Sequence, residues 1–179
     1  MEGFVILMPT LQLLSEHVIE DLKEFVLNPQ GFVLMVGKNG RGKTYAAMKI
    51  YEQLTPYKLP DRDHDLAWFV NQSDLNMIFN ESNEIYGSAK SVLKQAYISK
   101  LLVIDDLGTR PPSPAFMDFL YAIVDRRWNE RAMLATIITT NLDSTRIRKD
   151  FGDAIFSRIA SGRNYVVIGN DRRFTELGF

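Results

Sequence analysis

The chain has 179 residues and a formal net charge of -1, with 46% hydrophobic and 24% charged residues. These values favour one soluble globular domain with a sizeable core, and they exclude a global basic field, so any contact with nucleic acid has to be a local patch. The absence of cysteine excludes disulfides and thiolate metal sites and is consistent with the reducing cytoplasm, where we expect the protein.

The N-terminal part predicts a helix that leads into a buried strand. The apolar start lacks the positive region of a signal peptide, and no run is long enough to span a bilayer, so no membrane partner is expected. Leu14, Val18 and Leu22 recur at helical spacing in a helix expected over 15–27, which either only packs or also helps to form an adenine pocket. The apolar run 31–36, bounded by glycines, is typical of a buried parallel strand.

A phosphate-binding loop follows this strand. It fits the pattern G-x-x-x-x-G-K-[ST] and consists of Gly37, Lys38, Asn39, Gly40, Arg41, Gly42, Lys43 and Thr44. Glycines lack side chains, so we expect the backbone N–H groups here to cradle the phosphates of ATP. Lys43 is expected to reach the β- and γ-phosphates, and the Thr44 hydroxyl is expected to ligate Mg²⁺. A helix that starts at the loop would add its positive N-terminal end.

The rest of the chain alternates between predicted helices and strands. In chain order we expect a helix over 44–54, a strand over 66–70, a helix over 74–80 capped by Ser73, a helix over 88–97, a strand over 101–106, a helix over 116–131, a strand over 134–140, a helix over 145–159 broken near Gly152, and a strand over 164–168. The first of these helices should have Tyr45, Met48 and Tyr51 on its apolar face. The alternation predicts a three-layer α/β P-loop NTPase core with a five-stranded parallel sheet.

Polar residues follow two of the predicted strands. Asp105 and Asp106 end the third strand, where Asp105 can hold Mg²⁺ directly or through water and Asp106 can polarise the attacking water as a general base. Asn141 follows the fourth strand and would lie near the γ-phosphate, where a neutral amide orients water without competing for the metal. The alternative interpretation is an ordinary polar turn after each strand.

Together these motifs resemble the DnaC/IstB branch of the AAA+ ATPases, which contains bacterial replicative-helicase loaders and transposition helper ATPases. The resemblance covers roughly 14–173 and is carried by Asp-Asp-Leu-Gly at 105–108, Thr-Asn at 140–141 and Ser-Arg at 157–158. It implies an AAA+ core with Walker A at 37–44, Walker B at Asp105 and Asp106, and sensor 1 at Asn141. Many AAA+ enzymes have Glu where this chain has Asp106, but this branch commonly has Asp.

The resemblance also assigns two arginines. Arg158 would be the arginine finger that reaches the γ-phosphate of a neighbouring subunit, and the alternative is a solvated cation on a helix. Arg172 lies in a stretch similar to the closing Gly-x-Asp-x-Arg pattern of the family, in which the arginine contacts the nucleotide of its own subunit. The role of Arg172 is left open.

A DNA contact is expected in the helices of 73–97, where this branch carries elements that line single-stranded DNA. Lys90, Lys94 and Tyr97, together with Tyr86 and Lys100, offer charge contacts and stacking faces. The alternative is an ordinary amphipathic surface. A second basic set could face DNA, lie at a subunit interface or be solvated; it consists of Arg146, Arg148 and Lys149.

The function implied is an ATP-binding and ATP-hydrolysing helicase loader that acts in DNA replication, with a replicative helicase, single-stranded DNA and further copies of itself as partners. We expect one AAA+ domain over 1–179, with 1–30 as a short helical lead-in too small for a separate helicase-docking domain, and no C-terminal lid. The alternatives are a transposition helper ATPase and a nucleotide-gated binding module with little turnover. A small-molecule kinase would need a substrate lid and an acceptor site, for which the sequence offers no residues.

Overall fold

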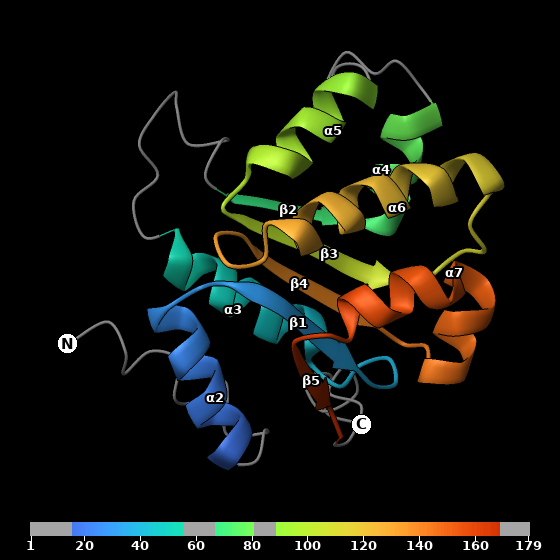
Figure 1. Cartoon of the computed structure of the whole chain (residues 1–179). Helices are drawn as coiled ribbons and strands as arrows, with labels where there is room; N and C mark the ends of the chain where they lie inside the picture. Colours follow the sequence, from blue (N-terminus) through green and yellow to red (C-terminus); the bar gives the residue numbers. More distant parts are fainter. Residues whose placement is uncertain (1–15, 56–66, 81–88, 169–179) are drawn as a thin grey trace, which may run out of the picture.

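The computed structural model describes residues 16–55, 67–80 and 89–168, which form a parallel sheet flanked by helices (Figure 1). The strands are β1 (Gly31–Val36), β2 (Ala67–Asn71), β3 (Leu101–Leu107), β4 (Ala135–Thr140) and β5 (Arg163–Val166). The helices are α2 (Glu16–Leu27), α3 (Lys43–Leu54), α4 (Gln72–Asn80), α5 (Ala89–Ile98), α6 (Pro114–Asn129) and α7 (Ser144–Ile159). In this part of the chain, no helix is long and apolar enough to cross a membrane.

The sheet has the strand order β2-β3-β4-β1-β5, and every neighbouring pair is parallel. The predicted five-stranded parallel sheet is therefore confirmed. Because β1 lies next to β4 and β4 next to β3, the residues that follow these three strands meet at one edge of the sheet. Asp105 has Asn71 as its partner on β2, and Val36 has Thr140 as its partner on β4.

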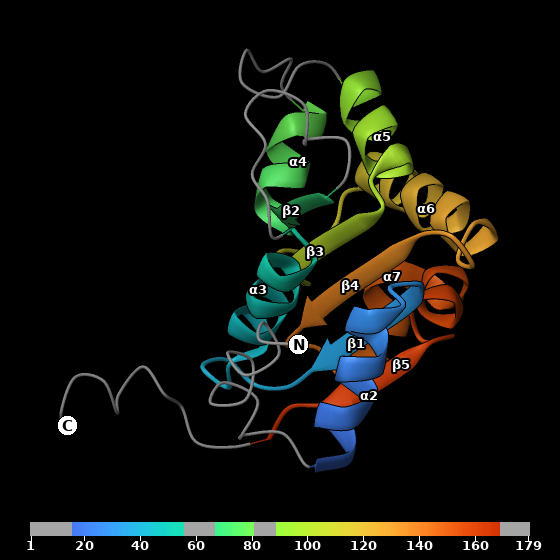
Figure 2. The ribbon, with the colours of Figure 1, turned by 90° about the vertical axis from the view of Figure 1, so that its left-hand side faces the viewer.

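The core has two layers, one on each face of the sheet. Successive residues of a strand point to opposite faces, so Phe32 and Leu34 of β1 pack with α4, α5, α6 and α7, whereas Val33 and Met35 pack with α2 and α3. Figure 2 shows α3 on the opposite side of the sheet from α6 and α7. The three-layer arrangement expected from the alternation of elements is thus confirmed.

Two helices, α4 and α6, begin two residues before the predicted start. Ser73 was expected to cap α4, but the helix begins at Gln72, and the Asn71 Oδ1 accepts the Asp74 N–H at 2.8 Å. Asn71 thus provides the acceptor that an N-cap supplies, because it stands where the chain leaves β2. The helix expected from 116 begins earlier, since Ser113 Oγ accepts the Phe116 N–H at 3.2 Å and the intervening proline suits a first helical turn.

The predicted apolar face of α3 is confirmed at Tyr51, which packs against the core, but it is wrong at Tyr45 and Met48. Tyr45 and Met48 are 49% and 37% exposed, and the buried positions include Ala46, Ala47 and Ile50. The small alanine side chains face the sheet, which turns the larger side chains at the neighbouring positions toward solvent. The break expected in α7 is confirmed, since Gly152 has φ 83° and ψ 158° inside the helical run.

Arg127 of α6 is a buried cation that was not predicted from the sequence. It is 0% exposed, and its Nη1 donates to the carbonyl oxygens of Ala96 at 2.7 Å and Ser99 at 2.8 Å, at the end of α5. On β4, its Nε donates to Thr136 Oγ1 at 2.7 Å and its Nη2 donates to Ala135 O. Burial lowers the pKa of Arg127 to about 9, while the charge of Glu130 raises it. Arg127 therefore fastens the end of α5 to α6 and the sheet.

Candidate nucleotide-binding site

The loop over 37–44 joins β1 to α3 at the edge of the sheet where the carboxyl ends of the strands lie. Gly40 and Gly42 have φ of 73° and 89°, which residues with a Cβ rarely adopt. Gly37 has a further constraint besides the one predicted. A Cβ on Gly37 would lie 2.4 Å from the Val167 carbonyl oxygen, so this glycine admits the segment that follows β5.

Lys43 begins α3 and is 5% exposed. Its Nζ donates to the Lys38 carbonyl oxygen at 3.0 Å and to the Asn141 Oδ1 at 2.7 Å. The ammonium group is therefore folded back over the loop and aimed at the end of β4. This is the position from which a lysine can neutralise the phosphates of a nucleotide held by the loop.

The Asp105 carboxylate is 7% exposed and has a hydroxyl on each oxygen. Thr44 Oγ1 donates to Oδ2 at 3.1 Å, and Thr139 Oγ1 donates to Oδ1 at 2.6 Å. Carboxylate and hydroxyl oxygens suit Mg²⁺, so Thr44 and Asp105 fit the expected metal. Among the residues that the structure describes, no group of three or more His, Asp or Glu side chains could hold a metal ion. Phosphate oxygens and water would therefore supply the remaining ligands, as is usual for this ion.

Asp106 has an unusual backbone conformation. Its φ is 56°, the only positive value among the described residues other than glycine. Its N–H donates to Thr139 Oγ1 at 2.9 Å, and the β3–β4 register shifts between Ile104 and Leu107. In a regular strand, consecutive side chains point to opposite faces. The irregular backbone instead lets Asp105 and Asp106 both contact residues at the end of β4.

Asn141 connects the two charged parts of the site. Its Oδ1 accepts from Lys43, and its Nδ2 donates to Asp106 Oδ1 at 2.8 Å. The side-chain amide needs this orientation to satisfy both partners, since it has one accepting and one donating end. The structure thus joins Lys43, Asn141 and Asp106 in one hydrogen-bonded chain, with Thr44 and Asp105 beside it.

Gln72 is a site-supporting residue that sequence reasoning missed. It is 1% exposed at the start of α4, and its Oε1 accepts the Gly108 N–H at 2.5 Å while its Nε2 donates to the Arg110 carbonyl oxygen at 2.9 Å. The loop that follows Asp106 is held by these two bonds. No local pattern identifies Gln72, because its partners lie 36 and 38 residues further along the chain.

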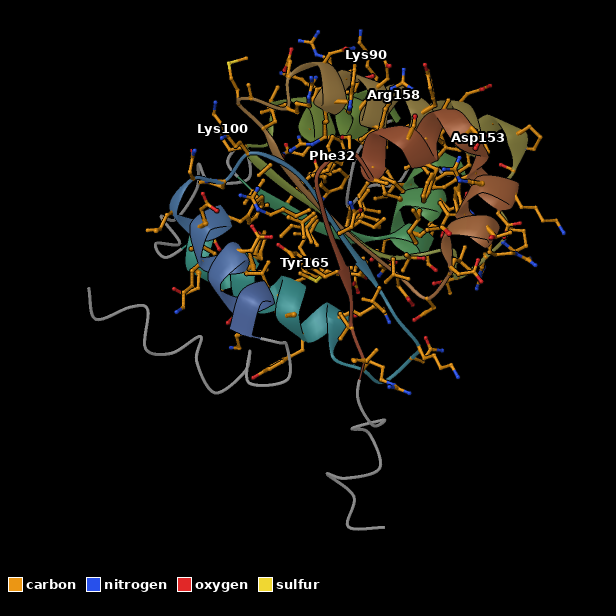
Figure 3. The ribbon with its side chains drawn as sticks, turned by 60° about the horizontal axis from the view of Figure 1, so that its bottom comes forward. Phe32, Lys90, Lys100, Asp153, Arg158 and Tyr165 are labelled. Atoms are coloured by element: carbon orange, nitrogen blue, oxygen red, sulfur yellow. The ribbon has the colours of Figure 1, made fainter. Side chains whose placement is uncertain are left out.

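The ion pair and the hydrogen bonds of Arg158 do not involve the loop over 37–44 of its own subunit. It lies on α7 and is directed to α6, where it forms an ion pair with Asp125 and a hydrogen bond with the Tyr121 hydroxyl. Figure 3 shows its side chain beside these two helices. In this geometry Arg158 does not act on the nucleotide site of its own subunit. Arg172 lies outside the described residues.

The expected DNA residues are placed in different environments. Lys90 is exposed on α5 and Lys100 is exposed just before β3 (Figure 3). Lys94 is also exposed on α5. Tyr97 is half-buried and packs against the core, which leaves less of its ring for stacking on a base. Tyr86 lies outside the described residues. In the second basic set, Arg146 pairs with Asp150 and Arg148 pairs with Asp153, whereas Lys149 is exposed.

A phosphate-binding loop, two carboxylates at the end of β3 and an amide at the end of β4, on this order of parallel strands, define a P-loop NTPase core of the AAA+ type. The model of the IstB-like ATP binding protein family matches residues 12–171, and the chain belongs to this family. The resemblance proposed from the sequence motifs is confirmed.

Individual relatives are distant. The chain is 24% identical over 168 residues to an ATP-binding protein of insertion sequence IS232 from Bacillus thuringiensis subsp. berliner, covering 90% of this chain and 63% of that protein. The crystal structure of the DnaC helicase loader is 24% identical with a TM-score of 0.65, over 87% of this chain and 90% of that one. AMPPCP-bound DnaA from Aquifex aeolicus is 15% identical with a TM-score of 0.71, over 89% and 48%. At these identities the structural likenesses establish the fold alone.

Proposed function

We propose that this protein binds ATP with Mg²⁺, hydrolyses it slowly when alone, and acts as a helicase loader in DNA replication. The observation that carries the ATPase part is the hydrogen-bonded chain from Lys43 through Asn141 to Asp106. This hydrogen-bonded chain joins the two groups to which we assign these roles, Lys43 for the phosphates and Asp106 for the attacking water, through the two ends of one amide. The membership of the chain in an ATP-binding family does not depend on this proposal.

The proposed reaction is the transfer of the γ-phosphoryl group to water. Asp106 accepts the proton of the attacking water, and Asn141, bonded to Asp106, orients the two groups that act on it. Lys43 compensates charge on the β- and γ-phosphates. Mg²⁺ held by Thr44 and Asp105 would supply further positive charge to the phosphate oxygens. In this scheme Asp105 holds the metal ion and does not act as the base. Both of its oxygens already accept hydrogen bonds from threonine hydroxyls, which makes it less available to take a proton from water.

Self-association completes the proposed site. Arg158 would enter the site of a neighbouring subunit, since its own contacts point to α6 rather than to the loop over 37–44. An arginine finger is worth roughly a thousandfold or more in rate. A lone subunit would therefore bind ATP and hydrolyse it slowly, and turnover would rise with protein concentration.

The helicase-loader role is supported by similarity to a protein of that activity. The DnaC helicase loader matches this chain over 90% of its own length. A related DnaA structure contains single-stranded DNA as well as AMPPCP. On this chain, the exposed Lys90 and Lys94 on α5 offer contacts for DNA phosphates. Single-stranded DNA and a replicative helicase are thus the proposed partners.

The second candidate is a transposition helper ATPase. It is supported by the similarity to an ATP-binding protein encoded by insertion sequence IS232, of whose length this chain covers 63%. The two roles share the ATP site and differ in the partner protein. ATP turnover that changes on addition of a bacterial replicative helicase supports the loader, whereas turnover that responds only to a transposase and its DNA ends supports the helper.

The basic test measures ATP turnover with and without single-stranded DNA, in wild type and in Lys43→Ala. Turnover that rises with DNA and is lost in the folded Lys43→Ala protein supports the proposal. Tight ATP binding with no turnover under any of these conditions would replace the ATPase with a nucleotide-gated binding module. Wild-type ATP affinity in Lys43→Ala would overturn the site itself.

A further inference from the structure

The guanidinium group of Arg158 is occupied by its own subunit. Its Nη2 pairs with Asp125 Oδ1 at 2.7 Å and lies 3.2 Å from the Tyr121 hydroxyl, while its Nη1 donates to the Ala154 carbonyl oxygen at 2.8 Å. Its Cζ also lies over the rings of Tyr121 and Trp128, at 5.0 and 5.6 Å from their centroids. α6 thus supplies an anion, a hydroxyl and two aromatic faces to this one cation.

This arrangement conflicts with the role proposed for Arg158 in a second subunit. The Nη groups that would contact a phosphate are the ones that Asp125, Tyr121 and Ala154 engage. A guanidinium has a fixed fork of donors, so it cannot keep these bonds and present the same fork to another subunit. Arg158 must leave Asp125 before it can act in trans.

We propose that Asp125 and Tyr121 are positioning residues that hold Arg158 withdrawn in the free subunit, and that the γ-phosphate of a neighbouring copy competes with Asp125 for it. This inference rests on the proposed trans role of Arg158. Arg158 is then released by the ATP-loaded site of a second copy. In a subunit without a loaded neighbour, Arg158 stays in contact with Asp125 and Tyr121 of α6.

The contact is suited to reversible release. The Arg158 and Asp125 side chains are 21% and 34% exposed, so water can solvate both after they separate. Among the buried side-chain polar atoms that the structure describes, Arg158 Nε alone has no hydrogen-bond partner. The withdrawn state therefore leaves the Nε–H donor of the guanidinium without a partner, and a phosphate oxygen can accept from it after release.

The size of the effect follows from the population of the withdrawn state. The apparent affinity for assembly is proportional to the fraction of subunits in which Arg158 is released and free to bind a neighbour. A partly exposed ion pair of this kind contributes up to about 1 kcal/mol, which corresponds to about fivefold in this fraction. Removing the Asp125 charge should therefore lower the protein concentration for half-maximal ATP turnover about fivefold and leave the turnover at saturation unchanged.

The test measures ATP turnover against protein concentration for wild type, Asp125→Asn, and Asp125→Asn combined with Arg158→Ala. The matched control is Glu130→Gln, which removes the ion pair between Arg126 of α6 and Glu130 at the C-terminal end of that helix. A lower half-maximal concentration in Asp125→Asn, with no change in Glu130→Gln and no gain in the double variant, supports the proposal. An unchanged or higher half-maximal concentration, or a lower plateau, would mean that Asp125 supports the active position of Arg158 or only the fold.

A spectroscopic measurement tests release directly in a protein with an intact finger. Trp68 and Trp128 are the two tryptophans of the chain, so Trp68→Phe makes Trp128 the sole tryptophan, whose emission is recorded with excitation beyond the absorption of tyrosine. Its emission should change when ATP drives assembly, because Arg158 leaves the ring, and it should not change in Arg158→Ala. Emission that is identical in the free and assembled protein contradicts the withdrawn state. If wild-type turnover depends on concentration and on Arg158 while these two tests fail, the trans finger stands and only the withdrawal is wrong.

Discussion

Removal of the Asn141 amide is the perturbation that most directly probes how the site is built. Asn141→Ala deletes two hydrogen bonds, one from the Lys43 ammonium at 2.7 Å and one to the Asp106 carboxylate at 2.8 Å. A hydrogen bond to a charged group is worth about 1.5–3 kcal/mol. If the bond to Asp106 is what positions the base, its loss should slow hydrolysis about ten- to a hundredfold. Lys43 remains, so we expect ATP affinity to change by less than about fivefold.

The assay separates binding from chemistry. Nucleotide affinity is measured by equilibrium titration, and hydrolysis is measured as a single turnover with enzyme in excess over ATP. Asn141→Leu, which has a similar shape and no hydrogen-bonding groups, should behave like Asn141→Ala. Asn141→Asp should be slower still, because it places a second carboxylate 2.8 Å from Asp106 and gives Lys43 a competing anion. A wild-type single-turnover rate in both Asn141→Ala and Asn141→Leu would refute the reasoning.

Three further variants test the other parts of the account. Asp106→Asn should retain ATP and Mg²⁺ binding and lose turnover, whereas Asp105→Asn should weaken Mg²⁺ binding; the reverse pattern in a Mg²⁺ titration would exchange the two roles. Lys90→Glu combined with Lys94→Glu should weaken single-stranded DNA binding in a salt-dependent way, and unchanged affinity would move the contact elsewhere. Arg127→Met should lower the free energy of unfolding by about 2–4 kcal/mol, since it strands buried carbonyl groups, and an unchanged urea midpoint would contradict this.

Local sequence patterns carried much of the fold and the core of the candidate site. The two carboxylates and Asn141 follow apolar runs, and parallel strands bring such residues to one edge, so their proximity to Lys43 could be predicted. The sheet order and the left-handed backbone of Asp106 could not, because both depend on how neighbouring strands pair. A further constraint on Gly37, the first glycine of the loop, could not be predicted either, since the atoms that exclude a side chain there belong to a segment about 130 residues later.

The sequence patterns did not predict the side chains that connect elements distant in the chain. Gln72 and Arg127 look in the sequence like ordinary polar residues at the start of one helix and near the end of another. Their burial is favourable only because backbone groups of other elements satisfy them, and no periodicity records those partners. The contact of Arg158 with Asp125 was hidden in the same way, although the position of Arg158 on a helix after the sensor strand was predicted.

The central claim is that ATP bound in one subunit is hydrolysed with the help of Arg158 from another. The measurement that tests it mixes Lys43→Ala subunits, which cannot bind ATP tightly, with Arg158→Ala subunits, which keep only the slow turnover of a lone subunit, and records ATP turnover across mixing ratios. In mixed assemblies an intact loop can face an intact arginine, so turnover should return in part and be highest at intermediate ratios. If no ratio recovers turnover under conditions in which wild type assembles and hydrolyses ATP, Arg158 does not act in trans and the shared site is wrong.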